Sequence, residues 1–181
     1  MDELALVRWI GGHRAAVLDG LAWLLGQSGR HGALWIALAL AGWGFRRVKL
    51  AAVWQVVLAA ALALVLATCV IKPLVERDRP HMQDAAVRVV GPLPETSSFP
   101  SGHAAAAFAA AVALARAWPG GTLVWWCLAT VMALSRVYAG AHFPTDILAG
   151  AILGWLAGRL VVAKTSWYSL RSVSRTSGVA R

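Results

Sequence analysis

Cysteine and acidic residues are scarce in this chain of 181 residues. The two cysteines, Cys69 and Cys127, lie inside apolar stretches and form no CxxC pair, so neither a zinc knuckle nor a disulfide framework is indicated. Aspartate and glutamate together number only 8, and the sequence offers no cluster of carboxylates able to hold Mg²⁺. Gly/Ser-rich linkers, internal repeats and low-complexity blocks are also absent, which favours a single domain.

Charged residues make up only 14% of the chain, whereas 59% of its residues are hydrophobic and its mean hydropathy is +0.64. A water-soluble globule of this composition would lack the polar surface to cover itself, so a membrane is the expected solvent. The formal charge of +9 and the pI of about 11.1 would suit a nucleic-acid partner. The lysines and arginines, however, lie between apolar runs and not along one stripe, which favours lipid headgroups.

The amino terminus lacks the uninterrupted apolar core of a cleaved secretory signal, because Asp2, Glu3 and Asp19 fall within its first 26 residues. We therefore expect residues 1–163 to form a single transmembrane domain. Residues 164–181 are rich in serine and arginine, and we expect them to form a basic, disordered cytoplasmic tail.

Six apolar segments approach the length of a membrane-spanning helix, which is about 20 residues and somewhat fewer inside a bundle. They cover approximately residues 15–27, 33–45, 50–71, 102–118, 122–138 and 146–163. The sequence thus predicts an all-α integral membrane protein, built as a six-helix transmembrane bundle. The first segment is short and contains Asp19, which leaves open whether this helix crosses the membrane or lies in its interface.

Short loops rich in lysine and arginine stay in the cytoplasm, and this rule orients the helices. Arg46, Arg47 and Lys49 join the second and third segments, and further basic residues follow the sixth, so both places are expected in the cytoplasm. The opposite, extracytoplasmic face then receives residues 72–101 and the turn at 140–145. We expect the chemistry on that face of a multi-pass protein of the inner or plasma membrane.

Glycine recurs every four residues along the sixth segment, at Gly150, Gly154 and Gly158. These positions share one helix face and let another backbone approach closely. Packing within the bundle is the simpler explanation, and contact between two copies of the chain is the alternative.

Three clusters place ionisable groups at the ends of apolar helices, where such groups are costly unless they have a task. The first runs from Lys72 to Arg79 and Pro80, and its proline favours an extended chain as the third helix leaves the bilayer. Two cations bracket this cluster. A basic patch that touches lipid phosphate is the alternative explanation, and it suits Arg77 better than Arg79.

The second cluster is Phe99-Pro100-Ser101-Gly102-His103, which an alanine-rich helix follows at once. Ser101 can cap that helix, whose free N–H groups can bind an anion. Gly102 lets a phosphate approach the backbone closely, and His103 could give a proton to a leaving oxygen. An ordinary capped helix with an interfacial histidine is the alternative.

The third cluster extends from Ser135 and Arg136 through a glycine-containing turn to His142 and Asp146. Pro144 suits the first turn of the sixth helix, which leaves Asp146 four residues after His142 and close enough to accept its ring N–H. The carboxylate would fix the tautomer and leave the other ring nitrogen free to attack. A capping aspartate beside a surface histidine is the alternative, and the neighbouring Arg136 argues against it.

In order and spacing, these clusters resemble the three motifs of the type 2 phosphatidic acid phosphatase superfamily. The matching residues are Lys72-x6-Arg79-Pro80, Pro100-Ser101-Gly102-His103 and Ser135-Arg136-x5-His142-x3-Asp146. Because that family also includes vanadium-dependent haloperoxidases, the resemblance implies an acid phosphatase/vanadium haloperoxidase-like core.

The resemblance also implies a role for each matching residue. His142 would attack phosphorus and become a transient phosphohistidine, with Asp146 orienting it. His103 would protonate the departing oxygen and then activate water. The phosphoryl oxygens would be surrounded by three cations and a helix start, namely Lys72, Arg79, Arg136, Ser101 and the Gly102 N–H. No metal or other cofactor is then expected, because these groups take the part that metals play in many phosphatases.

We therefore expect a metal-independent phosphatase whose partners are the bilayer and a lipid phosphate or polyprenyl diphosphate substrate, with no nucleic acid. Polyprenyl diphosphate is one candidate, but many undecaprenyl diphosphate phosphatases have aspartate where this chain has Gly102. That difference leaves phosphatidic acid, phosphatidylglycerol phosphate and lipid A phosphate as alternatives. A transporter that binds anions on the same cations without hydrolysis is the other class of function. Anion binding alone does not need a paired His142 and Asp146, which favours the enzyme. A haloperoxidase-like vanadate enzyme fits less well, because the chain is small and embedded in a membrane.

Overall fold

The computed structural model describes residues 2–177, and it describes side chains as far as residue 165. Within this part of the chain every regular element is a helix, and no strand is present. The prediction of an all-α protein is therefore confirmed for the described residues.

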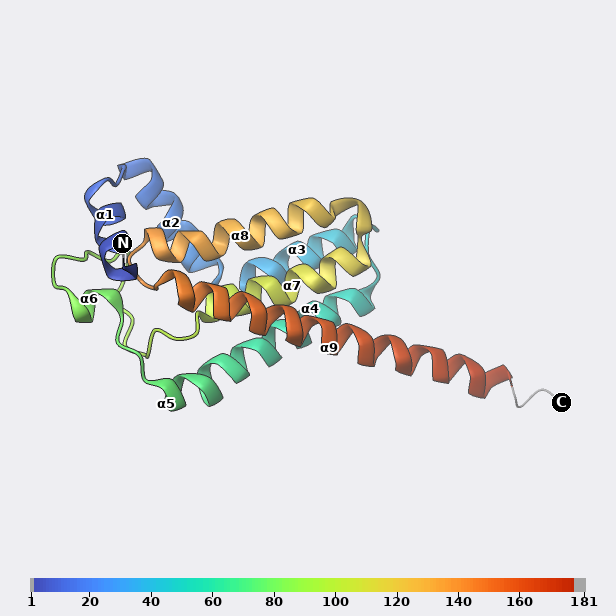
Figure 1. Ribbon diagram of the computed structural model, residues 1–181. Coiled ribbons are helices and arrows are strands. Elements are labelled where there is room, and N and C mark those ends of the chain that lie inside the picture. Colours follow the sequence, from blue (N-terminus) through green and yellow to red (C-terminus); the bar gives the residue numbers. More distant parts are fainter. Residues whose placement is uncertain (1, 178–181) are drawn as a thin grey trace.

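The body of the molecule is a bundle of long helices that run side by side (Figure 1). It consists of α3 (Ala33–Gly44), α4 (Leu50–Val65), α7 (Gly102–Ala117), α8 (Thr122–Tyr138) and α9 (Pro144–Ser177). Helix α7 lies at the centre and contacts α4, α8 and α9. Most of its residues are alanine and are buried on all sides, so the neighbouring backbones can approach it closely.

The glycine face of α9 packs against α7. A Cβ atom at Gly150 or Gly154 would overlap the carbonyl oxygen of Ser101 or Ala105, and one at Gly158 would lie 2.8 Å from the Ala109 oxygen. The close approach expected of these glycines is therefore made within the chain.

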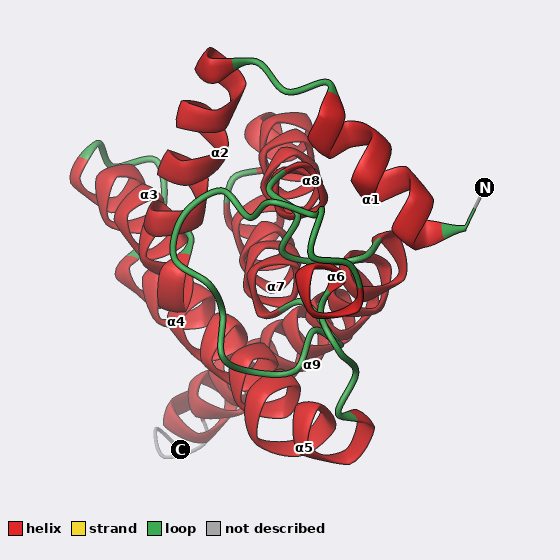
Figure 2. Ribbon diagram, turned by 90° about the vertical axis from the view of Figure 1, so that its left-hand side faces the viewer, coloured by secondary structure: helices red, strands yellow, loops and turns green. Residues whose placement is uncertain are grey.

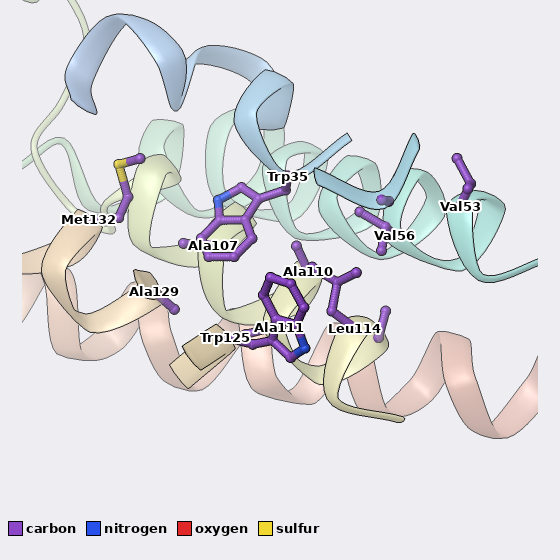
Figure 3. Close-up of a cluster of buried hydrophobic side chains, with 12 residues drawn as sticks. Trp35, Val53, Val56, Ala107, Ala110, Ala111, Leu114, Trp125, Ala129 and Met132 are labelled. Carbon is purple, nitrogen blue, oxygen red and sulfur yellow. The ribbon is translucent and has the colours of Figure 1, made fainter. Parts of the chain in front are cut away.

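Larger side chains fill the space on the other side of α7 (Figure 3). Trp35 of α3 and Leu114 of α7 are almost fully buried there, and Trp125 and Met132 reach in from α8. This cluster lies towards the middle of the bundle and fixes α3, α4 and α8 around the central helix.

Three helical stretches of the described chain are long and apolar enough to cross a membrane: Leu50–Gln83, Pro119–Tyr138 and Pro144–Thr165. The first continues α4 through a π-helical segment, Leu66–Ile71, and then α5 (Lys72–Val75). Helices α2 (Ala16–Ser28), α3 and α7 are shorter. With 12 residues, α3 extends about 18 Å, against roughly 30 Å of hydrocarbon in a bilayer.

Helix boundaries agree with the predicted segments to different degrees. Helix α8 covers the predicted residues 122–138, and α9 begins at Pro144, as expected for proline in a first turn. Helix α9 continues to Ser177, beyond the expected end near residue 163. The cytoplasmic tail of residues 164–181 stays a prediction, and residues 178–181 lie outside the described chain.

One helix, α1 (Glu3–Gly12), was missed in the sequence. Asp2 caps it, because its Oδ1 accepts the N–H of Ala5 at 2.6 Å. The acidic residues that argue against a signal peptide are thus also the start signal of a helix.

The three motif clusters gather at one end of the bundle. That end carries α1, α5 and the short α6 (Pro80–Gln83), whereas α9 ends at the other (Figure 1). The chain between α6 and α7 crosses this end in front of α7 (Figure 2). Two 3-10 turns lie between helices: η1 (Arg30–Gly32) connects α2 to α3, and η3 (Pro119–Gly121) connects α7 to α8.

Candidate active site

A cavity of about 630 Å³ opens at the motif-bearing end of the bundle. Its walls come from α2 and η1, from α4, from the chain between α6 and α7, and from the starts or ends of α7 and α8. All three motif clusters reach the cavity, with the residues Lys72, Arg79, Gly102, His103, Arg136 and His142. Groups that lie far apart in the sequence therefore share one space.

The two ring nitrogens of His142 face different surroundings. Nδ1 lies 3.4 Å from Oδ2 of Asp146 and has no hydrogen-bond partner of good geometry, so this contact is at the long limit of a hydrogen bond. Nε2 lies 3.5 Å from Nη1 of Arg79. The Asp146 carboxylate therefore lies on the Nδ1 side of the imidazole, and the Arg79 guanidinium lies on the Nε2 side.

Asp146 is fully buried and uses both carboxylate oxygens. Oδ1 accepts Nη1 of Arg77 at 2.7 Å, whereas Oδ2 accepts the Ser98 hydroxyl at 2.9 Å and the Phe143 N–H at 2.8 Å. These bonds hold the carboxylate plane in place beside His142. A buried carboxylate with this many donors is stabilised in its ionised form.

The surroundings keep His142 uncharged near neutral pH. Burial lowers the pKa of His142 to about 4; the charges of Arg79 and Lys72 act in the same direction, while Asp146 opposes them. A neutral imidazole has a free lone pair, which a nucleophile needs.

Three buried cations line the cavity. Apart from the 3.5 Å contact of Arg79 with Nε2 of His142, their hydrogen bonds within the described residues go to backbone carbonyls and serine or threonine hydroxyls. Lys72 donates to the Ser97 carbonyl; Arg79 donates to the carbonyls of Thr96, at 2.6 Å, and Ala141, at 2.7 Å. Each is less than a tenth exposed.

Arg136 donates to the carbonyl of Ala22 in α2 and to the Ser135 hydroxyl. A side chain at Gly26 would collide with its guanidinium, so glycine there lets α2 approach. Within residues 2–165, none of the three cations forms an ion pair with a carboxylate. Buried charges require a partner, and this arrangement fits an anionic ligand.

The start of α7 supplies two further residues to the cavity wall. His103 lines the cavity, and its Nε2 lies 3.0 Å from the Gly26 carbonyl. Gly102 also lies on the wall.

Ser101 caps α7, as predicted, by accepting the N–H of Ala104. Its own N–H donates to the Asp146 carbonyl at 3.0 Å, which ties the start of α7 to that of α9. Ser101 is fully buried and does not line the cavity, so its contact with a phosphoryl oxygen stays a prediction.

The sequence alone did not identify the partners of Asp146. The sequence suits Arg77 better than Arg79 to a patch that touches lipid phosphate, but the guanidinium of Arg77 binds Asp146 and Glu3, both at 2.7 Å. The sequence predicted no role for Ser98, although this residue lies only three positions before Ser101. Two arginines in Arg77-Asp78-Arg79 were a signal that one of them has a task inside the protein.

No group of three or more histidine, cysteine, aspartate or glutamate side chains that could hold a metal ion occurs among the described residues. The chemistry available from the chain itself is therefore a neutral imidazole, a second histidine and three cations around one cavity. Such a set suits nucleophilic attack on a phosphorus centre, with the cations stabilising negative charge.

Two proteins with assigned activities are similar to this chain in sequence. The chain is 42% identical over 139 residues to the decaprenylphosphoryl-5-phosphoribose phosphatase of Mycolicibacterium smegmatis, which covers 76% of this chain and 73% of that protein. It is 31% identical over 161 residues to the undecaprenyl-diphosphatase of Sulfolobus acidocaldarius, which covers 86% of this chain and 75% of that protein. Both relatives are phosphatases, and the transporter interpretation finds no support among the similar proteins.

Solved structures share the fold. The PAP2-type phosphatidylglycerolphosphate phosphatase of Bacillus subtilis superimposes with a TM-score of 0.72 at 25% identity, covering 91% of this chain and 84% of that one. A bacterial vanadium-dependent iodoperoxidase superimposes with a TM-score of 0.75 at 20% identity, covering 90% of this chain and 48% of that one, which shows the fold alone. The haloperoxidase-like core is thus confirmed. The sequence model of the PAP2 superfamily matches residues 52–169, more than half of the chain, and the protein belongs to the PAP2 superfamily.

Proposed function

We propose that this protein, a lipid phosphatase of the PAP2 superfamily, releases phosphate through a phosphohistidine on Nε2 of His142. The observation that carries the proposal is the set of three buried cations, Lys72, Arg79 and Arg136, which have no carboxylate partner within residues 2–165. All three line the cavity that His142 also lines, and a phosphoryl group bound there would compensate their charge.

The reaction has two steps. In the first, the lone pair of Nε2 forms a bond to phosphorus while the bond from phosphorus to the lipid oxygen breaks, and His103 gives that oxygen a proton. In the second, His103 takes a proton from water, the water oxygen attacks phosphorus, and the bond to Nε2 breaks to release phosphate. Asp146 orients the imidazole through Nδ1 and balances the positive charge that the ring gains.

The substrate we propose is a polyprenyl lipid that carries a phosphorylated sugar. The M. smegmatis relative acts on such a lipid, with a phosphodiester between the polyprenyl chain and ribose and a phosphomonoester at the other end of the sugar. One wall of the cavity suits the sugar and the phosphodiester. Trp23, Gln27 and Arg30 follow one another at helical spacing along α2 into η1 and all line the cavity.

The chemistry of this wall is complementary to that part of the lipid. Gln27 Oε1 accepts Nη1 of Arg30 at 3.2 Å, which directs the guanidinium along the wall. An indole ring can pack against a sugar, and a guanidinium can pair with a phosphodiester.

Polyprenyl diphosphate is the next candidate, because the S. acidocaldarius relative acts on undecaprenyl diphosphate. Gly102 counts against polyprenyl diphosphate, because many undecaprenyl diphosphate phosphatases have aspartate at that position.

A substrate panel tests the proposal. The purified protein is given polyprenylphosphoryl-5-phosphoribose, polyprenyl diphosphate, phosphatidic acid and phosphatidylglycerol phosphate in the same detergent, and phosphate release is measured. We expect the highest kcat/KM for the phosphoribose lipid. Arg30→Gln should raise its KM about tenfold and leave phosphatidic acid unaffected. Arg46→Gln, at the α3–α4 turn, is the control. A preference for any other lipid would overturn the choice of substrate.

The covalent step has its own test. With a substrate labelled in the phosphoryl group, rapid quenching should trap an alkali-stable, acid-labile label on the wild type and none on His142→Ala. Equal phosphate release by both proteins would remove the mechanism.

We further propose that six helices cross the membrane and that the cavity opens on its extracytoplasmic face. The support is the position of Arg46, Arg47 and Lys49 at the end of the bundle away from the cavity. The exposed Cys69 and Cys127 are first replaced by alanine, and Gln83→Cys is then labelled in intact cells with an impermeant maleimide. Labelling is expected from outside, whereas Arg46→Cys should be protected. The reverse pattern would invert the orientation.

A further inference from the structure

We infer that Glu3 and Arg77 form a positioning unit that holds Asp146 against His142, which makes α1 a part of the active site. The inference rests on the proposed role of His142 as nucleophile. Glu3 lies outside the residues that the family model matches, so this unit is partly supplied by a segment that the shared sequence does not define.

Arg77 bridges two carboxylates that come from opposite ends of the sequence. Its Nη1 lies 2.7 Å from Oδ1 of Asp146, and its Nη2 lies 2.7 Å from Oε2 of Glu3. The guanidinium also stacks on Phe143, 4.1 Å from the ring centre. Nη1 also donates to the Thr145 hydroxyl at 2.7 Å. These four contacts leave the guanidinium little freedom to rotate.

Glu3 also holds the start of α9, the helix that bears Asp146. Its Oε1 accepts the backbone N–H of Thr145 at 2.7 Å, and its Oε2 accepts the Thr145 hydroxyl at 2.8 Å. Thr145 is the second residue of α9, where free N–H groups favour a carboxylate. Burial opposes the ionisation of Glu3, but hydrogen bonds from Arg77 and Thr145 outweigh it and hold the pKa of Glu3 below its usual value.

The two oxygens of Asp146 then have separate tasks. Oδ1 is held by Arg77, and Oδ2 accepts Ser98 and Phe143 and faces His142. Removing the guanidinium would free Oδ1 and let the carboxylate turn about its own axis. Because the distance to Nδ1 of His142 is already 3.4 Å, a small rotation would break the contact that sets the tautomer.

The attachment of α1 to the protein does not depend on Glu3 alone. Val7 is fully buried, and it packs with Val87, Val137 and Phe143. A second ion pair, between Arg8 and Asp84 at 3.3 Å, also joins α1 to the chain before α7, and its arginine side chain is 66% exposed. This pair provides a matched control, because it anchors the same helix but touches no residue of the site.

The test compares kcat, KM and thermal stability for Arg77→Met, Arg77→Lys, Glu3→Gln and Arg8→Gln. We expect Arg77→Met to lower kcat about 10- to 100-fold and to leave KM within threefold, because Arg77 does not line the cavity. Arg77→Lys should recover part of the loss. Glu3→Gln should lower kcat about threefold to tenfold, and Arg8→Gln should leave it unchanged. The double variant Glu3→Gln/Arg77→Met should lose less activity than the product of the two single losses, since Glu3 acts partly through Arg77.

Two results would overturn the inference: a kcat of Arg77→Met within twofold of the wild type, or an equal loss for Arg8→Gln and Glu3→Gln. The latter would mean that α1 acts only as a structural support. Should Arg77→Met not fold, Glu3→Gln and Arg77→Lys carry the comparison. A His142→Ala arm separates the two proposals, because an active His142→Ala protein contradicts the mechanism, whereas an inactive one beside an unaffected Arg77→Met contradicts only the positioning unit.

Discussion

Replacing Asp146 by asparagine removes one charge and one acceptor from a fully buried side chain. The asparagine side chain has one oxygen, which can take the place of only one of the two carboxylate oxygens of Asp146. If its oxygen takes the place of Oδ1, the amide nitrogen faces the Phe143 N–H, now 2.8 Å from Oδ2. If it takes the place of Oδ2, the nitrogen faces Nη1 of Arg77, now 2.7 Å from Oδ1. Either orientation sets two buried donors against each other.

The magnitude follows from these two effects. A buried donor without a partner costs about 1–3 kcal/mol, a factor of roughly 5 to 150 in rate where the transition state bears the cost. In the first orientation the amide also donates towards Nδ1 of His142, which places the ring proton on Nε2, the atom that must attack. Loss of the correct tautomer alone costs about 10⁴-fold in a serine protease triad. We expect kcat of Asp146→Asn to fall about 10²- to 10⁴-fold.

Phosphate release from a dispersed lipid phosphate measures the effect, with thermal unfolding in the same detergent to show that the protein is folded. KM should stay within about threefold, because Asp146 does not line the cavity. A folded Asp146→Asn protein with a kcat within threefold of the wild type would refute the reasoning, since Asp146 would then not orient His142.

Three other predictions concern packing, pH and metals. Gly154→Ala sets a methyl group against the Ala105 carbonyl and should lower the free energy of unfolding by about 1–3 kcal/mol, whereas Gly20→Ala, whose Cβ would meet nothing within 4 Å, should raise it by about 0.5–1 kcal/mol; thermal unfolding separates them. The pKa of His142 is lowered to about 4 from 6.5, so the unfolded chain binds more protons between these values. Stability should therefore fall as the pH falls from 6.5 to 4, by at most on the order of 3 kcal/mol, and His142→Gln should lose less over this window. EDTA should leave activity unchanged, and vanadate should inhibit as an analogue of the transferring phosphoryl group; dependence on Mg²⁺ would contradict the mechanism.

Features that depend on neighbouring residues could be predicted from the sequence. The bounds of α8, the proline at the start of α9 and the Ser101 cap each follow from a local signal. The glycines of α9 indicated a close approach, because their spacing places them on one face.

Other features depend on contacts that no local signal encodes. Arg77 and Glu3 are 74 positions apart, and they meet only when α1 folds against the start of α9. The π-helical segment Leu66–Ile71 belongs to the same apolar run as α4, so hydropathy does not distinguish it from an ordinary helix. The sequence likewise does not indicate that the carbonyls of Ala22 and Gly26 accept hydrogen bonds from Arg136 and His103, because every residue has a carbonyl.

The buried cations explain why this site needs so much support from elsewhere in the fold. Lys72, Arg79 and Arg136 repel one another across the cavity, and burial makes that repulsion more costly than in water. Carbonyl oxygens from three segments offset part of the cost, but they carry only partial charges. A carboxylate partner would offset more, yet it would occupy the position that a phosphoryl group needs. Arg77 does not line the cavity, so its ion pair with Asp146 gives the buried carboxylate a cation. Lys72, Arg79 and Arg136 therefore all stay available to the substrate.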